Sequence, residues 1–386
     1  MTDLALSGKP LGARVAATAV FLANGSSIGA WAGSLPVLKQ NLSLSASGLS
    51  LALFAFASGS IVGLASAGWL AKFGSQRTMI IAAFGSAICL GLPGLASALP
   101  ALALAAFLFG LCNGLIDVSM NTYATTVQRA WRAPIMSSFH AAFSLGGLLG
   151  AAGMGIVLAH HFDAATGFLA ASIWMALLIL LAALLAPSEA QLNEAEPEAG
   201  AHAFSWPSPA LFGIGFLCFL AMLIEGALAD WSGVYLSTVA GATQGAAAAG
   251  YAGFAVMMAF GRLIGDRVVA TFGGMPVLRL GAFVVALGLA IALVLPVPII
   301  ATFGFALVGI GASNTVPLLF TAAGQSRTSA PAMGIAMVAT VGYAGFLLGP
   351  PMIGFAADLS SLRIALLIVL AAAALIAWTA GRILPR

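Results

Sequence analysis

Twelve apolar segments, separated by short stretches rich in Gly, Pro, Ser and charged residues, constrain this chain more than any other feature. A helix that crosses a bilayer needs about 20 apolar residues, and each segment approaches or exceeds that length. Apolar residues make up 61% of the chain and charged residues only 6%, which leaves too little polar surface for a soluble globule. We therefore expect an all-α polytopic membrane protein with twelve transmembrane helices, near residues 14–38, 46–71, 77–99, 100–127, 133–159, 164–186, 208–239, 245–265, 277–297, 298–323, 331–356 and 361–382.

The basic residues predict the topology. With the N-terminus in the cytoplasm, only Lys39 and Arg363 fall on the outer side, and an excess of Lys and Arg marks cytoplasmic loops. The first apolar segment is longer than the core of a signal peptide, so we expect it to be retained. Both termini are then cytoplasmic. The basic residues on that side are Lys9, Arg14, Lys72, Arg77, Arg129, Arg132, Arg262, Arg267, Arg279, Arg327, Arg382 and Arg386.

The longest polar stretch divides the chain into two similar halves. We expect a six-helix bundle at 1–186, an acidic cytoplasmic linker at 187–206 and a second bundle at 207–386. Short motifs recur about 200 residues apart: Trp31-Ala-Gly33 as Trp231-Ser-Gly233, and Ala133-Pro134 as Ala330-Pro331. Two parallel repeats predict a central cavity with a binding site at the midplane, reached by alternating access.

Twelve helices, the duplication and the acidic central loop resemble the major facilitator superfamily (MFS). The loop after the second helix also resembles that family's cytoplasmic signature through Gly68, Gly74 and Arg77, although the usual Asp is missing. The loop after the eighth helix keeps an Asp-Arg pair. The resemblance implies that these loops latch the cytoplasmic helix ends, with gate residues Gly68, Gly74, Arg77, Arg262, Asp266 and Arg267.

Two shorter motifs resemble one bacterial branch of that family. These are Asp117-Val-Ser-Met-Asn121 and the stretch from Glu225 to Trp231. The branch holds inner-membrane permeases, including one for rhizopine, an amino-inositol. The resemblance implies a multi-pass protein of the bacterial inner membrane and a sugar, cyclitol or amino-cyclitol as solute.

Three acids lie inside apolar segments, where an ionisable group is costly unless it faces a cavity or a partner. Asp117 and Glu225 lie deepest, and we expect them to bind and release the coupling proton, with His140 as a relay. Every basic residue maps to a helix end or a loop, so we expect no Lys or Arg to neutralise the acids. Asp230 lies about 140° from Glu225 on a straight helix, which suits an outer gate or a substrate contact.

Other polar and aromatic residues predict contacts to a small polar solute. Carboxylates and carboxamides can bind hydroxyls, while aromatic rings cover the C–H faces of a sugar-like ring. The competing interpretations are glue between helices for the Asn residues, a solvated helix end for Asp230 and an interfacial aromatic belt for the Trp pair. The candidate substrate-binding residues are Asn24, Trp31, Asn113, Asn121, Asp230, Trp231 and Asn314.

The leading functional hypothesis is a proton-coupled secondary transporter, a symporter or an exporter, that acts as a monomer in the lipid bilayer. One alternative is a proton-driven exporter of cationic amphiphiles, and another is a membrane sensor on a transporter scaffold. The sequence has no HExxH motif and no Walker loop, so we expect no enzyme, cofactor or metal site. Nucleic-acid binding lacks a basic patch.

Overall fold

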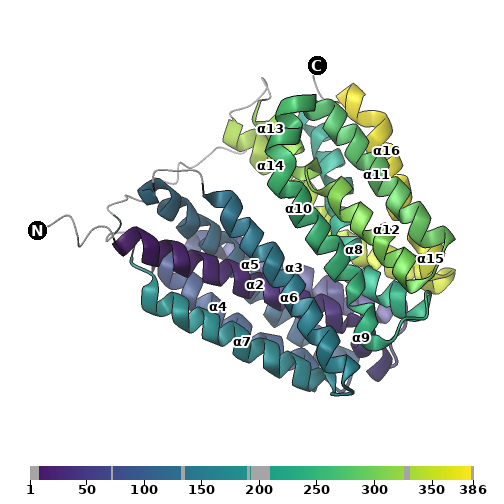
Figure 1. Ribbon diagram of the computed structural model, residues 1–386, viewed down its shortest axis with the longest axis horizontal. Coiled ribbons are helices and arrows are strands. Elements are labelled where there is room, and N and C mark those ends of the chain that lie inside the picture. Colours follow the sequence, from purple (N-terminus) through teal and green to yellow (C-terminus); the bar gives the residue numbers. More distant parts are fainter. Residues whose placement is uncertain are drawn as a thin grey trace, which may run out of the picture. The chain divides into compact units, whose positions relative to one another are not determined.

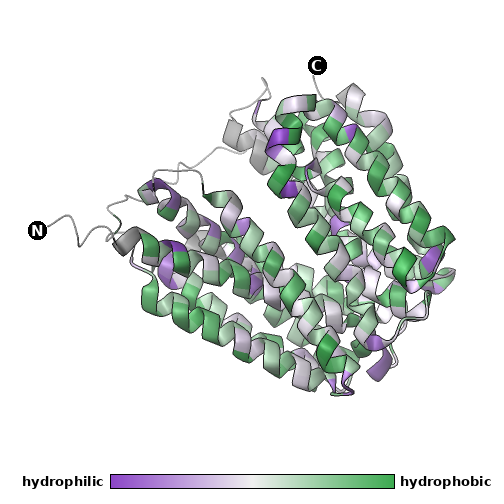
Figure 2. Ribbon diagram, viewed as in Figure 1, coloured by the Kyte–Doolittle hydropathy of each residue, from purple (hydrophilic) through white to green (hydrophobic). Residues whose placement is uncertain are grey.

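Long apolar runs give helices because a backbone in hydrocarbon must satisfy its own N–H and C=O groups. The computed structural model describes residues 8–70, 73–131, 135–188, 192, 209–325 and 331–383. Within these residues every regular element is a helix (Figure 1). Twelve spans in that part of the chain are long and apolar enough to cross a membrane, and Figure 2 shows hydrophobic residues along them. The expected fold class is confirmed.

The chain divides into two units, which we describe separately. Unit 1 comprises Met1–Leu44 and Leu51–Glu198, and unit 2 comprises Ser45–Ser50 and Ala199–Arg386. The predicted linker at 187–206 lies outside the described residues except for positions 187, 188 and 192. Lys72, Arg132 and Arg327 also lie outside them.

Unit 1 contains six long helices and a short 3-10 turn. The third predicted segment does not continue as one α-helix to residue 99. It ends at Gly91, because the 3-10 turn follows with Pro93 near its start. The elements are α2 (Gly8–Asn41), α3 (Ala46–Leu70, whose first residues belong to unit 2), α4 (Ser75–Gly91), η2 (Leu92–Leu95), α5 (Leu99–Trp131), α6 (Met136–Ala159) and α7 (Ala164–Leu185).

Unit 2 has the same sequence of long helices with two additional short ones, which precede α10 and α16. The helix that carries Glu225 and Asp230 is continuous through Gly226 and Gly233. The elements are α8 (Pro209–Thr238), α9 (Gln244–Ala247), α10 (Ala249–Phe272), α11 (Gly274–Val294), α12 (Pro298–Ala312), α13 (Thr315–Gly324), α14 (Pro331–Leu359), α15 (Leu362–Ala365) and α16 (Leu367–Ile383).

Glycines bring helix backbones into direct contact in unit 1. A Cβ atom at Gly29 on α2 would run into the carbonyl of Gly147 on α6, and one at Gly150 on α6 would run into the carbonyl of Ser26 on α2. Gly25 on α2 and Gly146 on α6 lie four residues before these glycines and make the same kind of contact. Small residues at this spacing let membrane helices approach closely. The pairing of α2 with α6 therefore depends on the absence of side chains at these positions.

The tenth predicted segment, 298–323, is two helices rather than one. Helix α12 ends at Ala312 and α13 begins at Thr315, and both lie within one membrane span. Pro317 accounts for the break, because its ring lacks an N–H donor and clashes with the carbonyl four residues earlier, at Ser313. The carbonyl of Ser313 is thereby freed for another donor.

Matching local features recur about 200 residues apart in the two units. Gly74 and Gly273 both precede a helix with positive φ, 85° and 82°, a backbone conformation that favours glycine. Asp163 and Ser361 both cap a helix by accepting a backbone N–H three residues later. The hydrogen bonds from the Thr166 hydroxyl and N–H also hold the pKa of the Asp163 carboxyl below its usual value. These matches extend the repeat seen in the sequence.

Candidate functional site

Three of the predicted site residues, Asn113, Asp117 and Asn121, lie at four-residue intervals on α5 in unit 1. The Asn121 amide donates to the backbone carbonyl of Asp117 at 2.7 Å and to its carboxylate Oδ1 at 3.3 Å. Asn113 lies one turn earlier, and its Oδ1 is buried with no hydrogen-bond partner among the described residues. Both carboxamides thus lie next to Asp117 along the helix, one bound to its carboxylate and the other open to a further donor.

The helix α2 contributes two of the predicted substrate-binding residues. Asn24 is buried and its amide donates to the sulfur of Met120 at 3.9 Å. Its Oδ1 has no partner within the described part of the chain, and neither has Nε1 of Trp31. The Trp31 ring is stacked on Phe56 with centroids 5.8 Å apart. A ring buried in this way does not lie in an interfacial aromatic belt.

His140 on α6 contacts an aromatic residue of α2. Its ring packs edge-on against Phe21, with centroids 5.4 Å apart, and its side chain is exposed. The Asp117 carboxylate receives a hydrogen bond from Asn121 on the same helix. The structure thus brings together Asp117 and Asn121, and the relay through His140 stays a prediction.

In unit 2, Glu225 on α8 has a basic partner. Arg262 Nη2 on α10 lies 3.4 Å from Glu225 Oε2 and forms an ion pair with it. The Arg262 Nε also donates to the Ser313 carbonyl at 3.4 Å, the group freed by the helix break. Glu225 Oε1 is buried and has no hydrogen-bond partner among the described residues. One carboxylate oxygen is therefore paired with Arg262, and the other can accept a hydrogen bond or a proton.

The expectation that no basic residue neutralises the buried acids is wrong for Glu225. The apolar pattern predicts that the eighth helix ends at residue 265, with Arg262 in its last turn. The structure continues α10 to Phe272, so Arg262 lies ten residues from the end, about 15 Å along the axis at 1.5 Å per residue. Its side chain reaches across to α8 instead of into a loop.

Asp230 and Trp231 lie on the same continuous helix, one and a half turns beyond Glu225. Asp230 is partly buried and has no hydrogen bond or ion pair among the described residues. Trp231 is fully buried, and its Nε1 has no partner within the described part of the chain. Because α8 does not unwind, the two carboxylates point in different directions, as a straight helix requires.

Tyr251 is a residue that sequence reasoning missed. It is buried on α10 and lies within electrostatic range of Arg262, Asp230 and Glu225. Tyr251 precedes Arg262 by eleven residues, which is three helical turns, so the two share one face of α10. That spacing in an otherwise apolar helix could have drawn attention to it.

Asn314 occupies the break between α12 and α13. Its amide donates to the Gly261 carbonyl on α10 at 3.3 Å and to the Ser313 hydroxyl at 3.0 Å. A Cβ at Gly265 would run into the Asn314 side chain. The Asn314 carboxamide thus connects the break to α10 and also binds within the break.

The predicted gate residues lie near helix ends. Gly68 falls in the last turn of α3, and Gly74 precedes α4 with positive φ. Arg77, Asp266 and Arg267 are exposed. Arg262 is the exception, since it lies inside unit 2 beside Glu225.

Comparison with known proteins gives a consistent result. Residues 17–330 match the model of the Major Facilitator Superfamily. An uncharacterised MFS-type transporter of Yersinia pestis is 38% identical over 91% of this chain and 91% of its own length. The membrane protein MosC of Rhizobium meliloti is 32% identical over 95% of this chain and 89% of its own length.

Solved structures share the fold. The nucleoside transporter NupG superimposes with a TM-score of 0.76 at 13% identity, over 96% of this chain and 98% of that chain. A bacterial homologue of the human lysosomal transporter Spinster superimposes with a TM-score of 0.71 at 16% identity, over 95% of this chain and 96% of that chain. At these identities the similarity extends to the fold and not to the substrate.

Proposed function

The chain belongs to the Major Facilitator Superfamily, and from this premise we propose that it is a proton-coupled secondary transporter of a small polar solute. It is a multi-pass membrane transporter and not an enzyme. The proposed elements are the coupling ion, the class of solute and alternating access. We also propose a location in the bacterial inner membrane as a monomer, with both termini in the cytoplasm, because this topology leaves only two basic residues outside.

The observation that carries the proposal is the state of Glu225. One oxygen of its carboxylate is paired with Arg262 at 3.4 Å, and the other is buried without a partner among the described residues. A proton that binds Glu225 removes the charge that holds Arg262. Because Arg262 also contacts Ser313 at the helix break, one protonation event changes contacts on α8, α10 and the end of α12. This is the kind of linkage that proton-driven transport requires.

The class of solute is supported by the buried polar atoms. In unit 1 these are Asn24 Oδ1, Asn113 Oδ1 and Trp31 Nε1, which have no hydrogen-bond partner within the described residues. Buried polar groups normally find partners, and a polyhydroxylated solute supplies both donors and acceptors. The resemblance to a branch with a rhizopine permease favours a cyclitol or amino-cyclitol among such solutes.

A thermal-shift screen of the purified protein tests the class of solute. We expect myo-inositol or an amino-inositol to raise the melting temperature, because a ligand that binds only the folded state at 100 times its Kd adds about 2.7 kcal/mol. Glucose and uridine serve as polar comparisons and tetraphenylphosphonium as a cationic amphiphile. A shift with tetraphenylphosphonium and none with any polar solute would contradict the proposal and favour an amphiphile exporter.

A further inference from the structure

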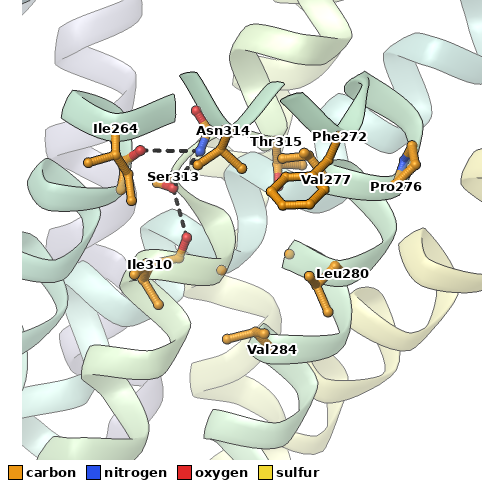
Figure 3. Close-up of a pocket in the computed structure, with 14 residues that line it drawn as sticks. Ile264, Phe272, Pro276, Val277, Leu280, Val284, Ile310, Ser313, Asn314 and Thr315 are labelled. Carbon is orange, nitrogen blue, oxygen red and sulfur yellow. Dashed lines mark hydrogen bonds between the residues drawn. The ribbon is translucent and has the colours of Figure 1, made fainter. Parts of the chain in front are cut away.

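An apolar cavity of about 400 Å³ lies inside unit 2, between α10, α11 and the break that joins α12 to α13. Ile264, Val268 and Phe272 recur every four residues on α10 and therefore form one ridge along it. Leu280 and Val284 of α11 lie on another side, and Figure 3 shows these side chains around a common space. Glu225 does not line the cavity.

The lining is suited to hydrocarbon. No charged side chain belongs to it among the described residues. The polar side chains of the lining, Ser313, Asn314 and Thr315, are consecutive, and the first two use their donors inside the protein. Ser313 Oγ donates to the Ile310 carbonyl at 2.7 Å, and the Asn314 amide donates to Gly261 and Ser313 (Figure 3). A polar ligand would find few donors there, whereas an apolar chain would contact the remaining walls.

Part of the cavity wall is exposed at the surface of unit 2. Two of its lining residues, Phe272 and Leu280, are 67% and 64% exposed. Other large apolar residues of α10 and α11, such as Leu263 and Phe283, are 60% exposed. In a protein that spans a membrane, exposed apolar side chains on its spans meet acyl chains. The mouth of the cavity lies in the half of the span next to the turn at Gly273.

We propose that this cavity binds one acyl chain of a phospholipid from the leaflet that adjoins the α10–α11 turn. An empty cavity forfeits dispersion contacts for every atom that lines it, and lipid tails are the apolar chains that reach its mouth. The bound chain packs against Ile310 and Ser313, beside the point where the helical hydrogen bonds of the tenth span are interrupted. It thereby stabilises the segment whose Ser313 carbonyl accepts a hydrogen bond from Arg262. The site does not depend on the identity of the transported solute.

Photo-crosslinking tests the site. The full-length protein is reconstituted in nanodiscs that contain a phospholipid with a diazirine on one acyl chain, irradiated, digested and analysed by mass spectrometry. We expect crosslinks concentrated on residues 264–284 and 310–315. Val284→Trp, which fills the cavity, should abolish that concentration. Leu287→Trp, at an exposed position of α11 that does not line the cavity, is the matched control and should leave it unchanged.

The proposal is overturned if crosslinks are spread evenly over the exposed apolar positions of all spans, or if Val284→Trp leaves the pattern unchanged. If Val284→Trp prevents folding, Val277→Phe blocks the same space with a smaller increase in volume. Val277→Phe should then abolish the concentration of crosslinks, and an unchanged pattern would overturn the proposal. Crosslinks to Trp378, which is 64% exposed on α16, report ordinary lipid contact and should persist in every variant.

Discussion

Glu225→Gln is expected to abolish proton-driven accumulation of solute in proteoliposomes while leaving solute exchange measurable. Glutamine keeps the size and hydrogen-bonding capacity of the side chain but cannot take up a proton or balance the charge of Arg262. The variant therefore removes coupling and retains the fold. The measurement is uptake of the solute found by thermal shift, with and without an imposed pH gradient. Uphill transport at the wild-type rate would exclude Glu225 from the coupling step.

Arg262→Gln should be more damaging to stability than Glu225→Gln, because it leaves a carboxylate without its counter-charge. Removing one partner of a fully buried pair costs about 3–5 kcal/mol, and the loss here should be smaller because the Arg262 side chain is 35% exposed. The double variant should recover part of the melting temperature lost in Arg262→Gln. The exposed Arg267 on the same helix gives the matched control, since Arg267→Gln removes a charge that forms no ion pair within the described part of the chain. Equal effects of the two arginine substitutions would contradict the pairing.

Gly29→Val is expected to prevent stable folding of unit 1. The new Cβ would run into the carbonyl of Gly147, and neither backbone can shift without disturbing the reciprocal contact of Gly150 with α2. Overpacking a side chain against other side chains costs about 1–3 kcal/mol, and backbone atoms yield less easily. We expect loss of the monodisperse protein in size-exclusion chromatography and a large fall in melting temperature.

Gly153→Val on α6 is the control for that experiment. A Cβ at Gly153 meets nothing within 4 Å, so the substitution adds the same side chain to a membrane helix without forcing two backbones apart. Its yield and melting temperature should stay close to those of the wild type. If Gly29→Val and Gly153→Val behave alike, the close approach of α2 and α6 is not what holds these helices together.

Hydrophobic segments predict the number of spans well because hydrocarbon imposes one requirement on every residue of a span. The boundaries follow less closely, and one boundary error had a chemical consequence. Ending the eighth helix at residue 265 made Arg262 a surface residue, whereas continuing it to Phe272 makes it the partner of Glu225. Gly265, the last residue of the predicted segment, lies inside α10, where the absence of a side chain makes room for Asn314.

Other features were present in the sequence but depend on neighbours that it does not name. The four-residue spacing of Gly25 with Gly29, and of Gly146 with Gly150, marks close packing, although only the structure pairs α2 with α6. A proline such as Pro317 inside an apolar segment weakens a helix, but only the structure shows that the freed Ser313 carbonyl accepts a hydrogen bond from Arg262. Asp117 and Asn121 could be paired from helical spacing alone, because both lie on one helix.

Proton coupling in this protein requires that Glu225 is a protonatable group whose charge is balanced by Arg262. Infrared difference spectroscopy of the purified protein in lipid, recorded across a pH titration, observes carboxyl protonation directly and needs no solute. We predict a carboxyl band that titrates in the wild type, disappears in Glu225→Gln and titrates at a different pH in Arg262→Gln. A wild-type spectrum that persists unchanged in Glu225→Gln would contradict the claim.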